Sequence, residues 1–443
     1  MLSRLNSQKL AQWLLLILLA LVEADPLTWP PPPARDPFYH PPENIDDLEP
    51  GAIIRHRAPP SPIAKFLGKP DIKDSYQILY KTTNSFNQSI ATALTVLVPP
   101  NAHFNKVISY QTFQDSAFIE CSPSFALQET GFHLGDITTQ FELVAPVGNL
   151  LSRGWVAILP DHEGPNAAFL ANRLAAHAVL DGIRAATRSG NITGVAKDPR
   201  VVLWGYSGGA VATGWAVEQQ PSYAPELKIA GAAYGGVVPN LLSAIGANDA
   251  TLFAGLLVSG VVGLSNEYKQ IDDLLNSHVL PKYKPLILRA KKQCLVQNAL
   301  ESLLRNVRGI VDDRSIWTKD PIISILKEND MGKAIPQIPL YIYHGSIDEV
   351  SPSHNTDVLV RNYCRQGATV EYVRLLLDEH ILGFITGFPG ALLWLINIME
   401  GNIFPVGCET KNLSLSPIDS KVTKLVDSSL LIDVLRSFKI PKF

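Results

Sequence analysis

Residues 201–214 read Val-Val-Leu-Trp-Gly-Tyr-Ser-Gly-Gly-Ala-Val-Ala-Thr-Gly. The run from Val201 to Trp204 is fully apolar, as in a buried strand, and the small residues from Gly209 onward favour a helix that packs closely on it. Between them lies a G-x-S-x-G motif centred on Ser207, which is typical of the sharp strand-to-helix turn that lifts a nucleophilic serine above a sheet edge. The alternative is a glycine-lined structural turn, but the flanking strand and helix favour a nucleophile.

The rest of the chain predicts an α/β fold with a mostly parallel sheet flanked by helices. Residues 51–100 contain alternating, β-branched segments, which are typical of antiparallel strands that open a sheet. Further along, short apolar runs alternate with helical stretches such as Ala167 to Arg188, which indicates strands buried on both faces. These runs are Lys106–Tyr110, Trp155–Leu159, Val201–Trp204, Ile229–Ala233, Pro339–Tyr343 and Val370–Val373.

Residues 241–336 have a different character and predict a helical cap, or lid, inserted into this core. Apolar residues between Val296 and Val307 recur at i, i+3 and i+4 spacing, which predicts a helix that ends at Gly309. An uncharged run, 252–264, belongs to the same insertion. We expect it either to pack within the cap or to become exposed when the cap opens.

The amino terminus has the features of a secretory signal peptide. Arg4 and Lys9 precede an apolar run from Trp13 to Val22, and Ala24 offers a small residue for cleavage. The run is too short for a membrane span, which needs about 20 apolar residues. Residues 1–24 therefore predict a secreted, extracellular protein.

The remaining segments complete the predicted organisation. Residues 25–50 are rich in proline, and we expect an extended arm without regular structure. The α/β core should then comprise residues 51–240 and 337–416, with residues 417–443 as a C-terminal tail. We see no internal repeat.

Composition excludes several classes of protein. The chain is 46% hydrophobic and 18% charged, which suits a large globular core. Its formal net charge of −3 offers no basic surface for nucleic acid, and no Cys/His spacing indicates a metal site. In an oxidising compartment the four cysteines predict two disulfides, for which the residues alone leave three pairings open. Three sequons, expected on exposed loops, are candidate glycosylation sites: Asn87, Asn191 and Asn412.

One further apolar stretch has the length of a membrane span. Residues 381–399 carry no charge. Gly383, Gly387, Pro389 and Gly390 interrupt the first half, so the sequence favours a loop followed by a buried helix from Ala391 onward. We therefore expect no transmembrane segment in the mature chain.

A serine nucleophile needs a base, and the base needs an orienting acid. In folds with this serine turn the acid follows the serine in the chain and precedes the histidine. The loop after the strand 339–343 carries Asp348, which directly follows a turn and is our candidate acid. Glu349 and Asp357 are the competitors, with Asp357 expected on the next helix.

His380 is the candidate base among the ten histidines. It alone follows both the acid and the last predicted strand, in a loop that we expect to lead to Gly383. His354 is too close to Asp348 in sequence to reach a serine on another loop. His344 precedes the acid, and for it, as for His162 and His177, packing in the core is the simpler interpretation.

The tetrahedral intermediate of acyl transfer needs two hydrogen-bond donors for its oxyanion. The backbone N–H of Gly208, immediately after the nucleophile, is the first candidate. The second should come from the loop after an early strand, where Asp115 follows the run 106–110. From the residues alone, Asp115 could equally be an ordinary loop carboxylate.

Several motifs in this order resemble the fungal secretory lipases of the lipase A type. The resemblance extends from about residue 36 to about residue 409, and it is weakest in the cap. The matching segments are Asp36-Pro-Phe-Tyr39, Gln114-Asp-Ser116, Cys121-Ser-Pro-Ser124, Pro160-Asp-His-Glu-Gly164, Ala167-Ala-Phe169, Val179-Leu-Asp-Gly-Ile-Arg-Ala185, Gly205-Tyr-Ser-Gly-Gly209 and His344-Gly-Ser-Ile-Asp348.

The resemblance implies an α/β-hydrolase with a helical lid that hydrolyses acylglycerols without a cofactor or metal. It implies a triad of Ser207, Asp348 and His380, and it gives Asp115 a role beside Gly208 in the oxyanion site. It also implies the disulfides Cys121–Cys294, between core and lid, and Cys364–Cys408, near the tail. The expected partner is an ester or lipid substrate, and a lipid–water interface is one place where the enzyme would bind it.

Three other functions remain open at this point. Some relatives deacetylate small secondary metabolites, so an esterase of that kind is the main alternative. A non-catalytic binding protein would often lack one residue of the triad, and all three are present here. A peptidase of the same fold would be expected to carry a gating domain, which the sequence does not show.

Overall fold

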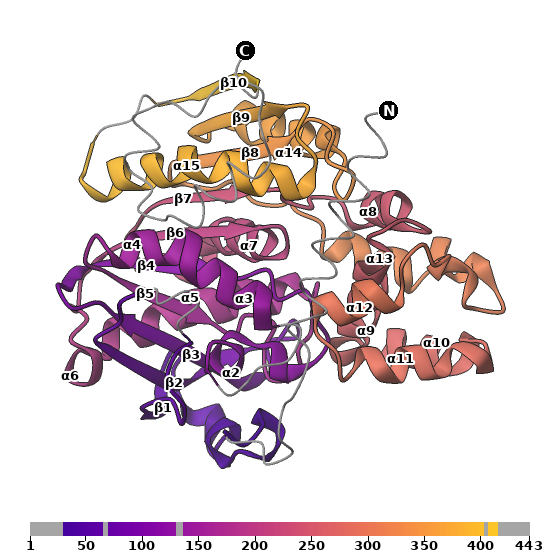
Figure 1. Ribbon diagram of the computed structural model, residues 1–443, viewed down its shortest axis with the longest axis horizontal. Helices are drawn as coiled ribbons and strands as arrows, with labels where there is room; N and C mark the ends of the chain where they lie inside the picture. The colour runs from indigo at the N-terminus through magenta and orange to yellow at the C-terminus, as the bar shows by residue number, and fades with distance from the viewer. Residues whose placement is uncertain (1–29, 65–69, 130–135, 403–405, 415–443) are drawn as a thin grey trace.

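A ten-stranded sheet forms the centre of the computed structural model, which describes residues 30–64, 70–129, 136–402 and 406–414 (Figure 1). The predicted signal peptide, residues 25–29 of the arm and the tail from residue 417 lie outside these ranges. The strand order is β1-β2-β3-β5-β4-β6-β7-β8-β9-β10. The strands are β1 Ile53–Arg57, β2 Asp74–Thr83, β3 Ser89–Val98, β4 His103–Gln111, β5 Trp155–Pro160, β6 Arg200–Tyr206, β7 Ile229–Gly235, β8 Leu340–Gly345, β9 Val370–Leu376 and β10 Cys408–Ser414.

The sheet is antiparallel at its beginning and parallel from β5 onward. β1, β2, β3 and β5 pair antiparallel in succession, whereas every pair from β5–β4 to β9–β10 is parallel. This confirms the predicted α/β-hydrolase fold class. Strand β10 was not foreseen, because its exposed and polar sequence gives no sign of burial.

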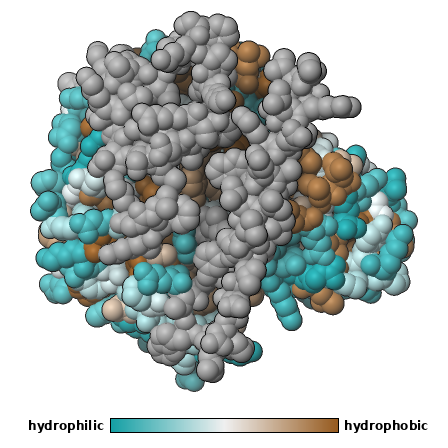
Figure 2. Space-filling view, viewed as in Figure 1, coloured by the Kyte–Doolittle hydropathy of each residue, from teal (hydrophilic) through white to brown (hydrophobic). Residues whose placement is uncertain are grey.

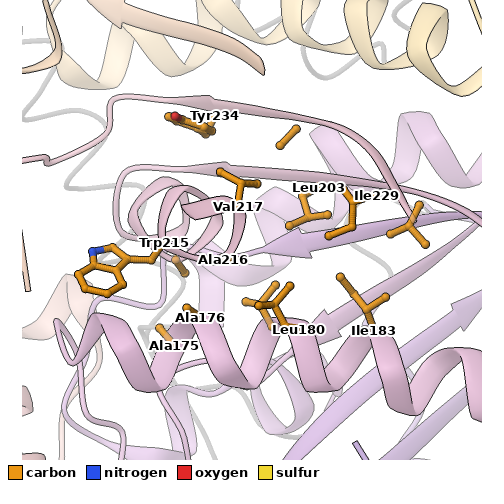
Figure 3. Close-up of a cluster of buried hydrophobic side chains, with 14 of the residues drawn as sticks. Ala175, Ala176, Leu180, Ile183, Leu203, Trp215, Ala216, Val217, Ile229 and Tyr234 are labelled. Carbon is orange, nitrogen blue, oxygen red and sulfur yellow. The ribbon is translucent and has the colours of Figure 1, made fainter. Parts of the chain in front are cut away.

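Helices cover both faces of the sheet because its central strands, β5 to β8, are buried over almost their whole length. On one face, α5, α7 and α14 close a core with the strands, and side chains from α5 and α7 point toward those of the sheet (Figure 3). On the other face, α4 and α15 pack on a second core. The core helices are α2 Pro123–Ala126, α3 Asp136–Glu142, α4 Gly148–Leu151, α5 Asn172–Arg188, α6 Gly190–Thr193, α7 Gly208–Tyr223, α14 Ser353–Arg365 and α15 His380–Met399.

The segment between β7 and β8 is helical and lies at one end of the sheet, drawn in orange in Figure 1. It has an apolar core of its own, in which the uncharged run around α9 is largely buried. Its helices are α8 Leu241–Asn248, α9 Ala254–Glu267, α10 Lys269–His278, α11 Lys284–Ala290, α12 Leu295–Glu301 and α13 Ile322–Glu328.

The predicted helix over residues 296–307 is wrong in its length, because α12 ends at Glu301. The backbone N–H of Leu304 donates to Thr251, and the carbonyl of Arg305 accepts from Ala250. These bonds tie the chain to the α8–α9 connection, and Leu304 adopts a positive φ of 57°. Tertiary hydrogen bonds thus override the apolar spacing after Glu301.

The prediction for residues 381–399 is also wrong, since a single helix, α15, begins at His380. Its glycines lie where the helix approaches tyrosines of β8: a Cβ at Gly387 would stand 2.2 Å from Tyr343 Cδ2, and one at Gly390 2.4 Å from Tyr341 Oη. α15 is the one described helix long and apolar enough to cross a membrane, and it packs against the sheet instead.

The expectation that the proline-rich arm has no regular structure is wrong for the part that the structure describes, residues 30–50. Three short 3-10 helices run over Pro33–Arg35, Pro37–Tyr39 and Ile45–Asp47. Asp36 accepts a hydrogen bond from the Phe38 N–H and forms an ion pair with Arg57 at 2.6 Å. Phe38 is buried against β2 and β3, so residues 30–50 are anchored to the sheet.

The three sequon asparagines are exposed, but only Asn87 lies in a turn. Asn191 lies in the short helix α6 and Asn412 in β10. The expectation that all three occupy loops is therefore wrong for two of them.

Candidate active site

Ser207 lies at the carboxyl end of β6, at the first turn of α7. Its φ of 52° is a strained conformation for a residue with a side chain, as expected for the serine turn. The turn requires glycines beside the serine. A Cβ at Gly205 would stand 2.3 Å from the Gly209 carbonyl oxygen, and one at Gly209 would stand 2.0 Å from the Gln111 carbonyl oxygen.

The strands bring the other candidate residues to the same edge. Gln111 at the end of β4 pairs with Gly205, and Gly235 at the end of β7 lies between Tyr206 and Tyr343 in register. The loops that follow β4, β6 and β8 therefore begin side by side. They carry Asp115, Ser207 and Asp348.

Ser207, His380 and Asp348 form one hydrogen-bonded chain. His380 Nε2 lies 2.8 Å from Ser207 Oγ, and His380 Nδ1 lies 2.7 Å from Asp348 Oδ2. With Nδ1–H donating to the carboxylate, Nε2 of a neutral imidazole is left as the acceptor for the serine hydroxyl. All three side chains are buried. The arrangement can take the proton of Ser207 as the hydroxyl attacks a carbonyl.

Asp348 is held as a carboxylate. Its Oδ1 accepts hydrogen bonds from the backbone N–H groups of Val350, at 3.0 Å, and Ser351, at 2.7 Å. Burial acts to raise the pKa of Asp348, but the charge and hydrogen bond of His380, with smaller effects from His344 and the Ser351 N–H, outweigh it and lower the pKa below its ordinary value. The negative charge needed beside the imidazole is thus stabilised.

His380 is the first residue of α15, not part of a loop as predicted. Its backbone N–H donates to Glu349 Oε2 at 2.9 Å, and its carbonyl accepts from the Tyr206 hydroxyl at 2.6 Å. Burial alone would lower the pKa of His380, but the adjacent Asp348 carboxylate reverses the effect and raises it. Glu349, a competing acid in the sequence analysis, and Tyr206 thus hold the backbone of His380, a role of which the local sequence carries no signal.

The competing residues have other contacts. Asp357 lies on α14, as expected, and accepts from Tyr372 and Arg374. His344 is buried, with Nε2 2.8 Å from the Ser351 carbonyl, and burial lowers its pKa. His354 is exposed on α14. His162 and His177 are buried, and the ring of His177 stacks on a tyrosine.

Asp115 lies beside the nucleophile. It has a positive φ of 46°, and a Cβ at Gly208 would stand 1.8 Å from Asp115 Oδ1, so this oxygen occupies the space next to Gly208. Oδ1 has no hydrogen-bond partner among the described residues. Burial raises the pKa of Asp115 to about 7, although the charge of His380 opposes the shift. A neutral carboxyl group is therefore accessible near neutral pH.

A second buried acid supports the Asp115 loop. Burial and the nearby Asp115 raise the pKa of Glu163, and the backbone N–H groups of Ser116 and Asp115 oppose the shift. Glu163 belongs to the segment 160–164, which is one of those that resemble the family. Apart from this, only its position just after strand β5 indicated in the sequence that it could lie near the site.

A narrow cavity of about 70 Å³ opens at Ser207, Gly208 and Asp115. One face of α8, formed by Leu241, Ala244, Ile245 and Asn248, lines one wall. A face of α9 from Leu256 to Leu264 lines another, so the lining is almost entirely apolar.

The cap is tied covalently to the core close to this site. The structure contains both expected disulfides, Cys121–Cys294 and Cys364–Cys408. Next to the first, the Ser116 hydroxyl donates to the Gln293 carbonyl at 2.9 Å. The loop that carries Asp115 is thereby linked to the cap.

Comparisons with known proteins agree with this geometry. A family model described as secretory lipase matches residues 128–404. Lipase A of Arthroderma benhamiae is 40% identical over 413 residues, covering 92% of this chain and 88% of its own. Lipase 1 of Candida albicans is 36% identical over 407 residues, covering 89% and 86%.

The structure is similar to that of Candida antarctica lipase A in its closed state. The TM-score is 0.83 at 30% sequence identity, and the match covers 92% of this chain and 95% of that chain. The sequence relatives and the solved structure thus match this chain over most of its length. The chain belongs to the secretory lipase family.

Proposed function

We propose that this protein, a carboxylic ester hydrolase by its family, is a secreted lipase that hydrolyses triacylglycerols through an acyl-enzyme. The observation that carries the proposal is the Ser207–His380–Asp348 hydrogen-bonded chain at the mouth of an apolar cavity. An acyl chain that enters such a cavity leaves water, and this contributes roughly 0.8 kcal/mol of binding free energy per buried CH₂.

The reaction begins when His380 Nε2 takes the proton of Ser207 as Oγ attacks the ester carbonyl carbon. Asp348 stabilises the resulting imidazolium. His380 then passes the proton to the oxygen of the leaving alcohol, and the C–O bond breaks to leave an acyl group on Ser207. Water, deprotonated by the same imidazole, releases the fatty acid by the reverse sequence.

Two donors stabilise the oxyanion in this proposal. The first is the backbone N–H of Gly208, since the leading N–H groups of a helix have no intrahelical partner. The second is the protonated carboxyl group of Asp115. Its pKa of about 7 and the position of its Oδ1 next to Gly208 support this role.

We assign residues 241–336 as the lid, residues 51–240 and 337–416 as the hydrolase core, and residues 1–24 as the signal peptide of a secreted, extracellular enzyme. Apolar side chains are exposed on the cap, where brown atoms lie among teal ones (Figure 2). They include Leu252, Leu288, Leu303 and Leu304. This surface supports contact with a lipid–water interface, since such patches mark interaction sites.

The test compares the wild type with Ser207→Ala on emulsified triolein, on tributyrin and on a short acetyl ester. We expect hydrolysis of the long-chain emulsion, with activity rising above the solubility limit of the substrate and lost in the alanine variant. Activity confined to the acetyl ester would replace this proposal with an esterase of acetylated small molecules. No activity on any ester would favour a binding protein.

A further inference from the structure

A second carboxylate, that of Glu349, contacts the candidate base from the side of its backbone. Glu349 Oε2 accepts the backbone N–H of His380 at 2.9 Å, whereas Asp348 Oδ2 lies 2.7 Å from the imidazole Nδ1. Glu349 is half-buried, and this N–H is the one hydrogen-bond partner that the described residues give its carboxylate. Two adjacent acids of the β8–α14 loop therefore face one histidine, although a triad uses only one of them.

His380 occupies an unfavourable place for a residue that must become a cation. It is the first residue of α15, a helix of 20 residues. The leading N–H groups of a helix lack intrahelical partners and give its N-terminus roughly half a positive elementary charge. The preceding residue, Glu379, makes no side-chain hydrogen bond to these groups. The helix end thus opposes a charged imidazole, in the same direction as burial, which by itself would lower the pKa of His380.

Three acids counteract burial at this imidazole. After burial, which lowers the pKa of His380, the largest effect is that of Asp348, which raises it through its charge and its hydrogen bond. The charges of Glu349 and Asp115 act in the same direction as Asp348. Asp115 loses its charge when it is protonated, which its proposed oxyanion role requires. Glu349 is therefore the one of the three that can offset the helix end itself.

The other ionisable groups near the base do not supply such a charge. Burial lowers the pKa of His344 and raises that of Tyr206, so both are uncharged near neutral pH. Burial also raises the pKa of Asp378, whose carboxylate accepts a hydrogen bond from a hydroxyl of α15. Glu379 is exposed, and water and salt screen its charge. The contact of Glu349 with the first N–H of the helix distinguishes it from these groups.

We propose that Glu349 is a positioning residue whose charge counteracts the positive end of α15, so that His380 can take up the proton of Ser207. The same contact holds the first residue of the helix, and with it the imidazole, in place. The inference rests on the proposed function, since it needs His380 to act as the base.

The test compares the pH profiles of kcat/KM on a soluble short ester for the wild type and Glu349→Gln. Glutamine has nearly the same shape and can still accept the N–H through its amide oxygen, so the substitution removes the charge alone. At the pH optimum kcat/KM should fall about two- to fivefold, the scale of one charge at a helix end. The acid limb, where activity falls at low pH, should move to lower pH, because His380 loses a charge that raises its pKa.

Two control variants separate the charge from the contact. Glu379→Gln removes a carboxylate next to His380 that is exposed and makes no hydrogen bond to the helix end. Tyr206→Phe removes the hydrogen bond to the His380 carbonyl and changes no charge. Both should keep the acid limb of the wild type, even if Tyr206→Phe lowers kcat.

An acid limb that stays in place in Glu349→Gln would overturn the inference, since Glu349 would then act only as a hydrogen-bond acceptor. An equal shift in Glu379→Gln would do the same. A loss near 10⁴-fold in Glu349→Gln would instead make Glu349 the acid of the triad. The position of the limb does not depend on how much enzyme folds, and Glu349→Ala, which should show at least the same shift, is a second variant. In these cases ester hydrolysis by the wild type leaves the proposed function intact, whereas a wild type that cleaves no ester removes both.

Discussion

The protonation state of Asp115 connects the environment of a single side chain to the pH range of the enzyme. Burial raises its pKa to about 7, and it lies beside Gly208, where a carboxylate would repel an oxyanion. If the neutral form donates, kcat/KM on a soluble short ester should fall as pH rises through about 7. The measurement is a pH profile of the wild type and of Asp115→Asn.

Asp115→Asn presents an N–H donor that does not titrate, so its alkaline decrease should disappear. Asp115→Ala offers no donor, and kcat should fall roughly 10²- to 10³-fold, as when an oxyanion donor is removed. An unchanged alkaline limb in Asp115→Asn would show that another group controls it.

His380 should control the acid limb of the same profile. The base must be neutral, and Asp348 raises its pKa, so activity should fall as pH drops through this raised value. Asp348→Asn removes the charge. It should lower kcat by about 10⁴-fold and move the acid limb to lower pH, because burial alone lowers the pKa of His380. An acid limb that stays in place in Asp348→Asn would contradict the assignment.

At the level of single elements, α15 shows how packing can override local sequence rules. Pro389 removes one helical hydrogen bond, and glycine in a helix interior costs about 1 kcal/mol relative to alanine. The helix forms nonetheless, because its glycines allow the backbone to approach Tyr341 and Tyr343. That gain depends on β8, which lies elsewhere in the sequence.

Gly387→Ala should therefore destabilise the protein although alanine favours helices. Its Cβ would overlap the Tyr343 ring, and overpacking costs typically 1–3 kcal/mol. Gly246→Ala in α8 is the control, because its Cβ would meet nothing within 4 Å. Urea unfolding should show a loss only for Gly387→Ala. Equal effects of the two variants would mean that α15 tolerates a wider spacing from the sheet.

The parts that the sequence predicted correctly are those set by local pattern. The turn at Ser207 and the buried strands follow from short-range signals, and the fold brings Asp348 and His380, proposed as acid and base, next to Ser207. The parts that it missed depend on distant partners. The short α12 depends on bonds to the α8–α9 connection, and the roles of Glu349 and Glu163 depend on backbone groups that the fold brings near them.

At the scale of the whole molecule, the Cys121–Cys294 disulfide joins the cap to the core and closes a long loop of the chain. Cys121 and Cys294 are 173 residues apart, whereas Cys364 and Cys408 are 44 residues apart. If a disulfide acts by lowering the entropy of the unfolded chain, the one that closes the longer loop stabilises the folded state by about 1 kcal/mol more than the other. Replacing the first pair by alanines should therefore lower the free energy of unfolding further than replacing the second. A larger loss from the Cys364–Cys408 pair would indicate that local contacts around β10 dominate.

The insertion of the cap between β7 and β8 also sets a time order. Ser207 is made before the cap, and His380, 173 residues later, is made after it. At synthesis rates of about 5–20 residues per second, His380 is added to the chain roughly 10 to 35 s after Ser207. Throughout that interval Ser207 has no base, so the nascent chain has no hydrolytic activity. The ability to cleave lipid esters thus arises only after the segment between β7 and β8, and strands β8 and β9, have been synthesised.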